Sequence, residues 1–150
     1  MTLTSPEATG ALAVSLGKTL RSGDVILLSG GIGAGKTHFA RSLIRSLQDT
    51  PEDIPSPTFT LVQTYDTRLG ELWHADLYRL SGPDQCDELG LTEAFDTAIC
   101  LVEWPDRLGS LVPPGALSLT LDPLGDGDER SLTLGWSDPR WDGPVGELSG

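Results

Sequence analysis

The sequence contains no asparagine, only two lysines and only two cysteines, and these shortages exclude several classes of protein. Guanine-specific GTPases use an NKxD motif, which a chain without asparagine cannot have. The cysteines, Cys86 and Cys100, lack CxxC spacing, so we expect reduced, partly buried thiols with no chemical role. A disulfide framework is therefore excluded as the basis of the fold.

Long apolar runs and basic clusters are also missing. No stretch approaches the length of a membrane span, and the N-terminus lacks the basic and apolar regions of a signal peptide, so we expect a cytosolic protein. The 10 lysines and arginines stand against 22 aspartates and glutamates, which gives a formal net charge of -12. Because nucleic-acid backbones attract basic residues, we expect no direct binding to nucleic acid by the chain alone.

Glycine, in contrast, is concentrated in one segment. Residues Gly30–Thr37 read GGIGAGKT and match the phosphate-binding pattern GxxxxGK[ST]. They follow the apolar run Val25–Leu28 and precede a helical pattern. Glycines let successive backbone N–H groups turn toward an anion, and the following helix directs its positive end to the same place. We expect Lys36 to reach the β- and γ-phosphates of a nucleotide and Thr37 to ligate Mg²⁺.

The hydrophobic pattern predicts a P-loop NTPase-like, three-layer α/β domain over residues 1–134. Two runs that are apolar at every position, Val25–Leu28 and Ile99–Val102, predict adjacent parallel strands at the centre of a mixed, mostly parallel sheet. Helices are predicted after Ser5 and after the phosphate loop, and a weak one over residues 84–95.

Two antiparallel hairpins are predicted to extend this sheet, one within residues 58–76 and one within residues 117–134. Residues 135–150 are rich in glycine, proline and acids. We expect them to form a mostly loose C-terminal tail.

Two acidic residues are candidates to complete a nucleotide site. Glu103 directly follows Ile99–Val102, where a Walker-type site needs a carboxylate for Mg²⁺, although the same spacing fits an acid that ends a strand at the surface. Asp76 shares one face with His74 and Tyr78 if their strand continues. It could orient water or share the metal shell, or it could be an ordinary edge-strand acid. We expect His74 to be packed or hydrogen-bonded, since no second histidine or cysteine stands at ligand spacing.

The arginines distinguish the remaining nucleotide-binding classes. Small-molecule kinases of this length usually carry an arginine-rich lid over the transferred phosphate, whereas the arginines here are scattered. The scattered arginines therefore disfavour a small-molecule kinase, which stays the alternative interpretation. A nucleotide-sensing protein whose ATP state controls a protein partner suits a small acidic chain without a lid. The missing arginine finger also predicts that hydrolysis by the chain alone is slow.

Four short motifs in series resemble one family. GGIGAGKT at 30–37, SPTF at 56–59, HADLYR at 74–79 and VEWP at 102–105 are similar in order and spacing to the bacterial TsaE (YjeE) proteins. The resemblance implies an Mg²⁺-dependent ATPase required for the threonylcarbamoyladenosine modification of tRNA, which supports the transfer reaction without performing it. It also implies docking on a TsaB-TsaD heterodimer that ATP binding and hydrolysis would reset between turnovers.

The resemblance further implies the residues of the site. Lys36, Asp76 and Glu103 would be catalytic, and Thr37, Glu103 and Asp76 would hold Mg²⁺. The contacts to ATP would come from Thr9, Gly33, Ala34, Gly35, Lys36, Thr37, His38, Trp104, Asp106 and Arg130. Two residues depart from the family pattern, because Gly31 stands where aspartate is common and His38 where a second hydroxyl is common.

Overall fold

The structure, a computed structural model, describes residues 1–31, 34–50, 54, 60–125 and 127–148. Within these residues the strands are β1 (Thr2–Leu3), β2 (Val25–Ser29), β3 (Val62–Thr67), β4 (Gly70–Asp76), β5 (Ile99–Glu103), β6 (Leu117–Pro123) and β7 (Arg130–Gly135). The α-helices are α1 (Pro6–Gly17), α2 (Lys36–Ser46), α3 (Pro83–Glu88), α4 (Leu91–Thr97) and α5 (Asp142–Leu148). Two 3-10 helices, η1 (Pro105–Leu111) and η2 (Pro139–Trp141), complete the described elements.

All strands belong to one sheet with the order β1-β7-β6-β2-β5-β4-β3. β2 pairs in parallel with β5 and β6, and β5 also pairs in parallel with β4. The predicted central pair and both predicted hairpins, β3–β4 and β6–β7, are confirmed. The sheet is mixed but not mostly parallel. The pairs β3–β4 and β6–β7 are antiparallel because each hairpin adds a strand without a crossover helix, and β1 also pairs antiparallel with β7 at the edge of the sheet.

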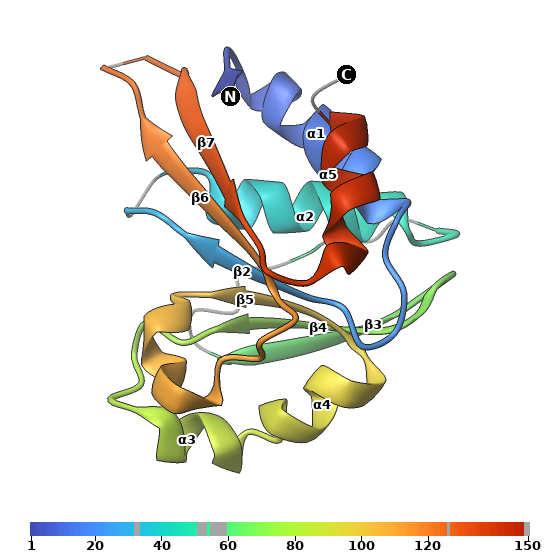
Figure 1. Cartoon of the computed structure of the whole chain (residues 1–150), viewed down its shortest axis with the longest axis vertical. Helices are drawn as coiled ribbons and strands as arrows, with labels where there is room; N and C mark the ends of the chain where they lie inside the picture. Colours follow the sequence, from blue (N-terminus) through green and yellow to red (C-terminus); the bar gives the residue numbers. More distant parts are fainter. Residues whose placement is uncertain (32–33, 51–53, 55–59, 126, 149–150) are drawn as a thin grey trace.

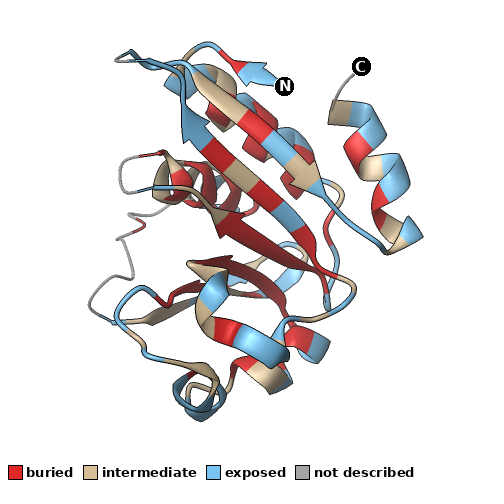
Figure 2. Cartoon of the chain, turned by 60° about the vertical axis from the view of Figure 1, so that its left-hand side comes forward, coloured by how far each residue is buried: buried red, intermediate tan, exposed pale blue. Residues whose placement is uncertain are grey.

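Helices cover both faces of the sheet, as predicted for a three-layer domain (Figure 1). α1, α2 and α5 lie on one face, and α3 and α4 lie on the other. Along β5, Ile99 and Leu101 join the core under α1 and α2, whereas Cys100 and Val102 join the core beside α4. Buried residues therefore follow the central strands without alternation (Figure 2), which explains their continuous apolar runs.

Local signals fix the helices where the sequence predicts them. The Ser5 hydroxyl accepts a hydrogen bond from the Ala8 amide at 3.1 Å, and Pro6 is the first residue of α1. The predicted weak helix is two short ones, α3 and α4, separated at Gly90 with φ 84°. α2 directly follows the phosphate loop, so its N-terminus points toward the ends of β2 and β5.

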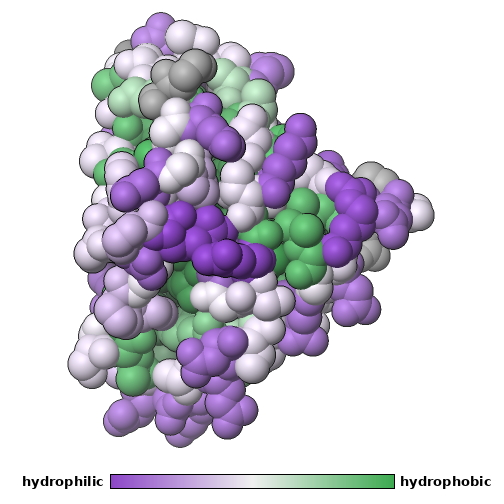
Figure 3. All heavy atoms as spheres, turned by 45° about the vertical axis from the view of Figure 1, so that its right-hand side comes forward, coloured by the Kyte–Doolittle hydropathy of each residue, from purple (hydrophilic) through white to green (hydrophobic). Residues whose placement is uncertain are grey.

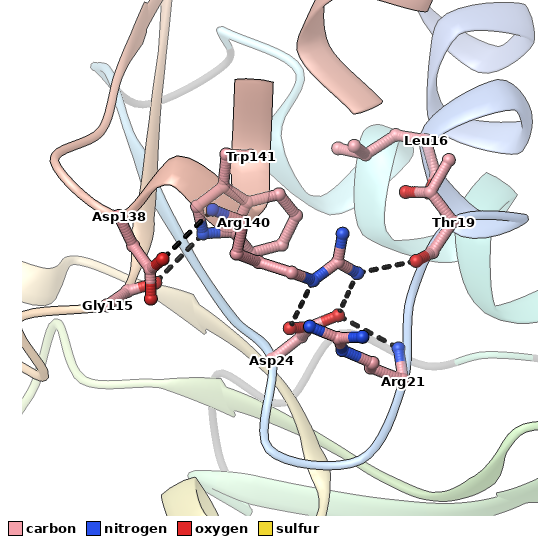
Figure 4. Close-up of polar contacts among 8 residues, drawn as sticks. All are labelled: Leu16, Thr19, Arg21, Asp24, Gly115, Asp138, Arg140 and Trp141. Atoms are coloured by element: carbon pink, nitrogen blue, oxygen red, sulfur yellow. Dashed lines mark hydrogen bonds and ion pairs between the residues drawn. The ribbon is translucent and has the colours of Figure 1, made fainter. Parts of the chain in front are cut away.

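The expectation of a loose tail is wrong for residues 135–148. Trp141 is fully buried, and its indole Nε1 donates to the Gly115 carbonyl at 2.8 Å. The Arg140 guanidinium forms an ion pair with Asp24, with 2.6 Å between Nη2 and Oδ2, and donates to the Thr19 carbonyl (Figure 4). A single buried tryptophan and a satisfied ion pair outweigh the polar composition of the segment.

Few large apolar side chains are exposed among the residues that the structure describes. Those most exposed come from different segments: Met1, Tyr78, Val112, Leu124 and Trp136. On the face drawn in Figure 3, hydrophobic residues gather in small patches separated by hydrophilic ones. Among the helices of the described residues, none combines the length and apolar character that a membrane span requires.

The burial of Trp141 predicts that the C-terminal segment contributes strongly to folding. Trp141→Ala should lower the free energy of unfolding by about 3–5 kcal/mol, because it removes a large ring from the core and leaves the Gly115 carbonyl without its donor. Trp136→Ala is the matched control, since that ring is 39% exposed and should cost much less. Denaturant unfolding measures both, and equal losses would contradict the assignment of Trp141 to the core.

Candidate functional site

A cavity of about 410 Å³ lies where the carboxyl ends of β4 and β5 meet the start of α2. Its volume is in the range typical of small-molecule and cofactor sites. The described residues that line it are Gly31, Ala34, Gly35, Lys36, Thr37, His38, Asp76, Tyr78, Glu103 and Trp104. Ligands of open α/β sheets commonly bind at this end of the strands.

The loop before α2 depends on glycine for its shape. Gly30 has φ 136°, and a Cβ atom there would lie 2.2 Å from the Leu121 carbonyl oxygen. Gly35 has φ 105° and immediately precedes the helix. Both angles are in the region that favours glycine, so the chain can turn sharply from β2 into α2. The first turn of α2 is thereby brought to the cavity.

Lys36 is a buried cation at the first position of α2. Its Nζ donates to the carbonyl oxygens of Gly30 at 2.5 Å and Gly31 at 3.3 Å, and lies 3.9 Å from the centre of the Trp104 ring. Burial lowers the pKa of Lys36 below its usual value, and this effect exceeds the opposing influence of the carboxylates of Glu103, Asp76 and Asp106. An anion bound in the cavity would stabilise the charged form of the lysine.

Glu103 and Asp76 are brought together by the register of two parallel strands. They are direct partners across β4 and β5, and they are only 2% and 5% exposed. The Thr37 hydroxyl donates to Glu103 Oε1 at 3.0 Å, and the other carboxylate oxygen lies 3.3 Å from the same hydroxyl. The alternative that Glu103 is a surface acid ending a strand is therefore wrong.

The donors at this position are oxygen atoms, which Mg²⁺ prefers. They are the hydroxyl of Thr37 and the carboxylates of Glu103 and Asp76. Within the described residues, no three histidine, cysteine, aspartate or glutamate side chains form a metal-binding group by themselves. Mg²⁺ commonly takes one or two carboxylates and completes its shell with phosphate oxygens and water, so the residues present fit that ion together with a phosphate ligand.

The row of side chains on β4 only partly continues as predicted. His74 is fully buried and hydrogen-bonded, with Nε2 2.7 Å from Glu103 Oε2. The strand ends at Asp76, whose Oδ1 accepts the Tyr78 amide at 3.0 Å. Tyr78 is 45% exposed, and its ring lies against Trp104 with 4.8 Å between centroids.

The contact among Tyr78, Trp104 and Lys36 was not predicted. Trp104 has φ 59°, an unusual angle for a residue with a side chain, and this turn after β5 places its ring over the lysine. No spacing rule links the three positions along the chain. The parallel pairing of β5 with β4 on one side and with β2, which leads into α2, on the other brings them together.

The predicted site residues divide into three groups. The cavity is lined by Ala34, Gly35, Lys36, Thr37, His38, Asp76, Glu103 and Trp104, which the sequence had placed at one site. Gly33 and the SPTF motif at 56–59 lie outside the described residues. Thr9, Asp106 and Arg130 are not among the described lining residues, so their contact with a nucleotide stays a prediction.

These three residues have other partners. The Thr9 hydroxyl is 3.4 Å from the Ser5 carbonyl within α1, and Asp106 forms an ion pair with Arg107. Arg130 donates from Nε to the Ala34 carbonyl at 3.1 Å, so it supports the phosphate loop from β7. His38 Nε2 lies 2.9 Å from the Pro6 carbonyl, which links the start of α2 to the start of α1.

The chain is similar in sequence to one family model and to known proteins that share one name. The family model described as "Threonylcarbamoyl adenosine biosynthesis protein TsaE" matches residues 3–132. The tRNA threonylcarbamoyladenosine biosynthesis protein TsaE of Rickettsia conorii is 40% identical over 133 residues, which are 89% of this chain and 75% of that protein. The protein of the same name from Bacillus subtilis is 37% identical over 131 residues, 87% of this chain and 80% of that one.

A solved structure is also similar. The crystal structure of YdiB from Bacillus subtilis superposes with a TM-score of 0.80 at 32% identity and covers 99% of this chain and 92% of that chain. The likeness therefore extends beyond the residues matched by the family model.

The conformation of the loop predicts a sharp difference between two adjacent glycines. Gly30→Ala should lower the free energy of unfolding by about 2 kcal/mol or more, because the methyl group meets the Leu121 carbonyl at an unfavourable φ. At Gly31 a Cβ atom meets nothing within 4 Å, so Gly31→Ala should be nearly neutral. Thermal or denaturant unfolding compares the two. Similar stabilities for both variants would show that the loop does not need the described conformation of Gly30.

Proposed function

The chain belongs to the TsaE family of threonylcarbamoyl adenosine biosynthesis proteins, and from this premise we propose that it binds and slowly hydrolyses ATP in support of the threonylcarbamoyladenosine modification of tRNA. In this proposal the chain does not transfer the threonylcarbamoyl group. It docks on a TsaB-TsaD complex and resets that complex between turnovers.

One observation carries the nucleotide part of the proposal. Lys36, Thr37 and Glu103 converge on one cavity, although Glu103 is 66 residues from Thr37 in the sequence. A buried ammonium group beside an oxygen-donor pair fits a phosphate chain with its divalent ion. The N-terminus of α2, eleven residues long, adds its positive end to the same place.

Each residue has a chemical task in this proposal. Lys36 neutralises negative charge on the β- and γ-phosphates. Thr37 and Glu103 would hold Mg²⁺, and Asp76, which lines the same cavity, would share the metal shell. When bound, the ion would offset charge that develops on the phosphate oxygens. Asp76 is the candidate to orient the attacking water, and Trp104 packs beside the nucleotide.

The residues that line the cavity are a reason to expect slow ATP hydrolysis by the isolated chain. None of the described residues that line it is an arginine. Phosphoryl-transfer enzymes commonly use an arginine to stabilise the transition state, and a protein partner can supply it. A TsaB-TsaD complex is the partner that the family membership suggests, and a small-molecule kinase is the alternative to this assignment.

The two lysines of the chain allow a controlled test of nucleotide binding. Lys36→Ala should weaken ATP binding by at least about tenfold, because it removes the one lysine of the cavity. Lys18→Ala removes the other lysine from an exposed position after α1 and should leave the affinity unchanged. Calorimetric titration measures both. The assignment fails if Lys36→Ala binds ATP as tightly as the unaltered protein while remaining folded.

Hydrolysis distinguishes the proposed function from a kinase. The purified chain with ATP and Mg²⁺ should release phosphate slowly, and addition of a TsaB-TsaD complex should raise the rate, because no arginine lies among the described residues that line the cavity. A phosphate-release assay with the complex in one arm and candidate metabolites in the other checks this. Rapid release by the chain alone, or stimulation by a metabolite and not by the complex, would contradict the proposal.

A further inference from the structure

His74 is a fully buried polar residue that contacts the site without lining its cavity. Its Nε2 lies 2.7 Å from Glu103 Oε2, and the two side chains are 0% and 3% exposed. Because a carboxylate oxygen accepts hydrogen bonds, Nε2 carries the proton in this contact. The other ring nitrogen, Nδ1, has no hydrogen-bond partner among the described residues. Among the described residues, Glu103 is therefore the hydrogen-bond partner of the imidazole ring.

The strand register explains how His74 reaches Glu103. Asp76 pairs with Glu103 across β4 and β5, and His74 pairs with Leu101 two residues earlier. Alternate residues of a strand share a face, and Leu72 and Leu101 both belong to the core under α2. His74 and Glu103 follow these leucines on the same face, so the imidazole lies diagonally beside the carboxylate.

Glu103 needs such a contact because its side chain can rotate about several bonds. Among the described residues, two side chains hold the carboxylate: Thr37, from α2, and His74, from β4. Thr37 lines the cavity and is itself a proposed metal ligand, whereas His74 is not among the described lining residues. A ligand in the cavity therefore does not compete with Glu103 for the hydrogen bond that His74 donates.

We propose that His74 is a positioning residue that fixes the Glu103 carboxylate in the orientation needed to hold Mg²⁺ with the nucleotide. This inference rests on the proposed function, since it assumes that Glu103 faces a metal ion. His74 touches neither the ion nor the nucleotide and acts through Glu103. Loss of an outer partner of this kind typically lowers metal affinity by about 10- to 100-fold.

The test compares ATP affinity in Mg²⁺ with ATP affinity in EDTA, both by calorimetry, for the full chain and three variants. His74→Leu removes the donor, and His74→Gln keeps an amide donor on a side chain of similar reach. Leu72→Ala is the matched control, because Leu72 is fully buried on the same face of β4 and belongs to the core cluster under α2. The void that Leu72→Ala leaves in the core should lower the melting temperature without altering the contact between His74 and Glu103.

The gain in affinity produced by Mg²⁺ should fall by about tenfold or more in His74→Leu, while the affinity in EDTA stays unchanged. His74→Gln should recover most of that gain, and Leu72→Ala should retain it despite lower stability. If His74→Leu does not fold, His74→Asn, whose shorter amide does not reach Glu103, replaces it with the same expectation.

A full Mg²⁺ effect in His74→Leu, or in His74→Asn where that variant replaces it, would overturn the positioning role and leave the proposed function intact. Equal losses of the Mg²⁺-dependent gain in ATP affinity in His74→Leu and Leu72→Ala would also overturn the positioning role, because they would reflect lower stability alone. A different outcome, no ATP binding by the unaltered protein in Mg²⁺, would remove the proposed function and this inference together.

Discussion

The burial of opposite charges at the end of the central strands is the constraint on which the site depends. Lys36 and Glu103 are 6% and 2% exposed, and a buried charge is costly unless nearby groups compensate for it. Backbone carbonyls and the Trp104 ring surround the lysine, while Thr37 and His74 hold the glutamate. These partners come from several elements of the chain, so the sheet register and the glycine loop must both form before the charges are satisfied.

This arrangement links the fold to the proposed activity. β2, β5 and β4 lie side by side in parallel, so their carboxyl ends deliver the loop, Glu103 and Asp76 to one edge of the sheet. The hairpin strand β7 supports the same loop through Arg130. In the proposed function this site holds an anion and a divalent ion, and none of the described residues that line it is an arginine. Family membership places the chain in threonylcarbamoyladenosine biosynthesis. In the proposed function, a partner complex supplies the group that completes the site.

Sequence patterns predicted the parts of the molecule that depend on local chemistry. The runs Val25–Leu28 and Ile99–Val102 are apolar because both faces of the central strands are covered, and the P-loop pattern requires particular residues at particular spacings. Such patterns could not predict the contacts between residues of different strands. The pairing of Asp76 with Glu103 and the contact of Lys36 with Trp104 depend on register, and the anchoring of Trp141 depends on a cavity that the rest of the chain creates.

In the proposed function, the cavity bounded by Lys36, Thr37 and Glu103 holds the phosphates of Mg²⁺-bound ATP. A crystal structure with Mg²⁺ and a non-hydrolysable ATP analogue tests it most directly. Phosphate oxygens are expected within about 2.7–3.2 Å of Lys36 Nζ. The ion is expected at about 2.0–2.1 Å from the Thr37 hydroxyl, with Glu103 facing it directly or through water. A nucleotide bound elsewhere, or a Glu103 carboxylate turned away from the ion, would contradict it.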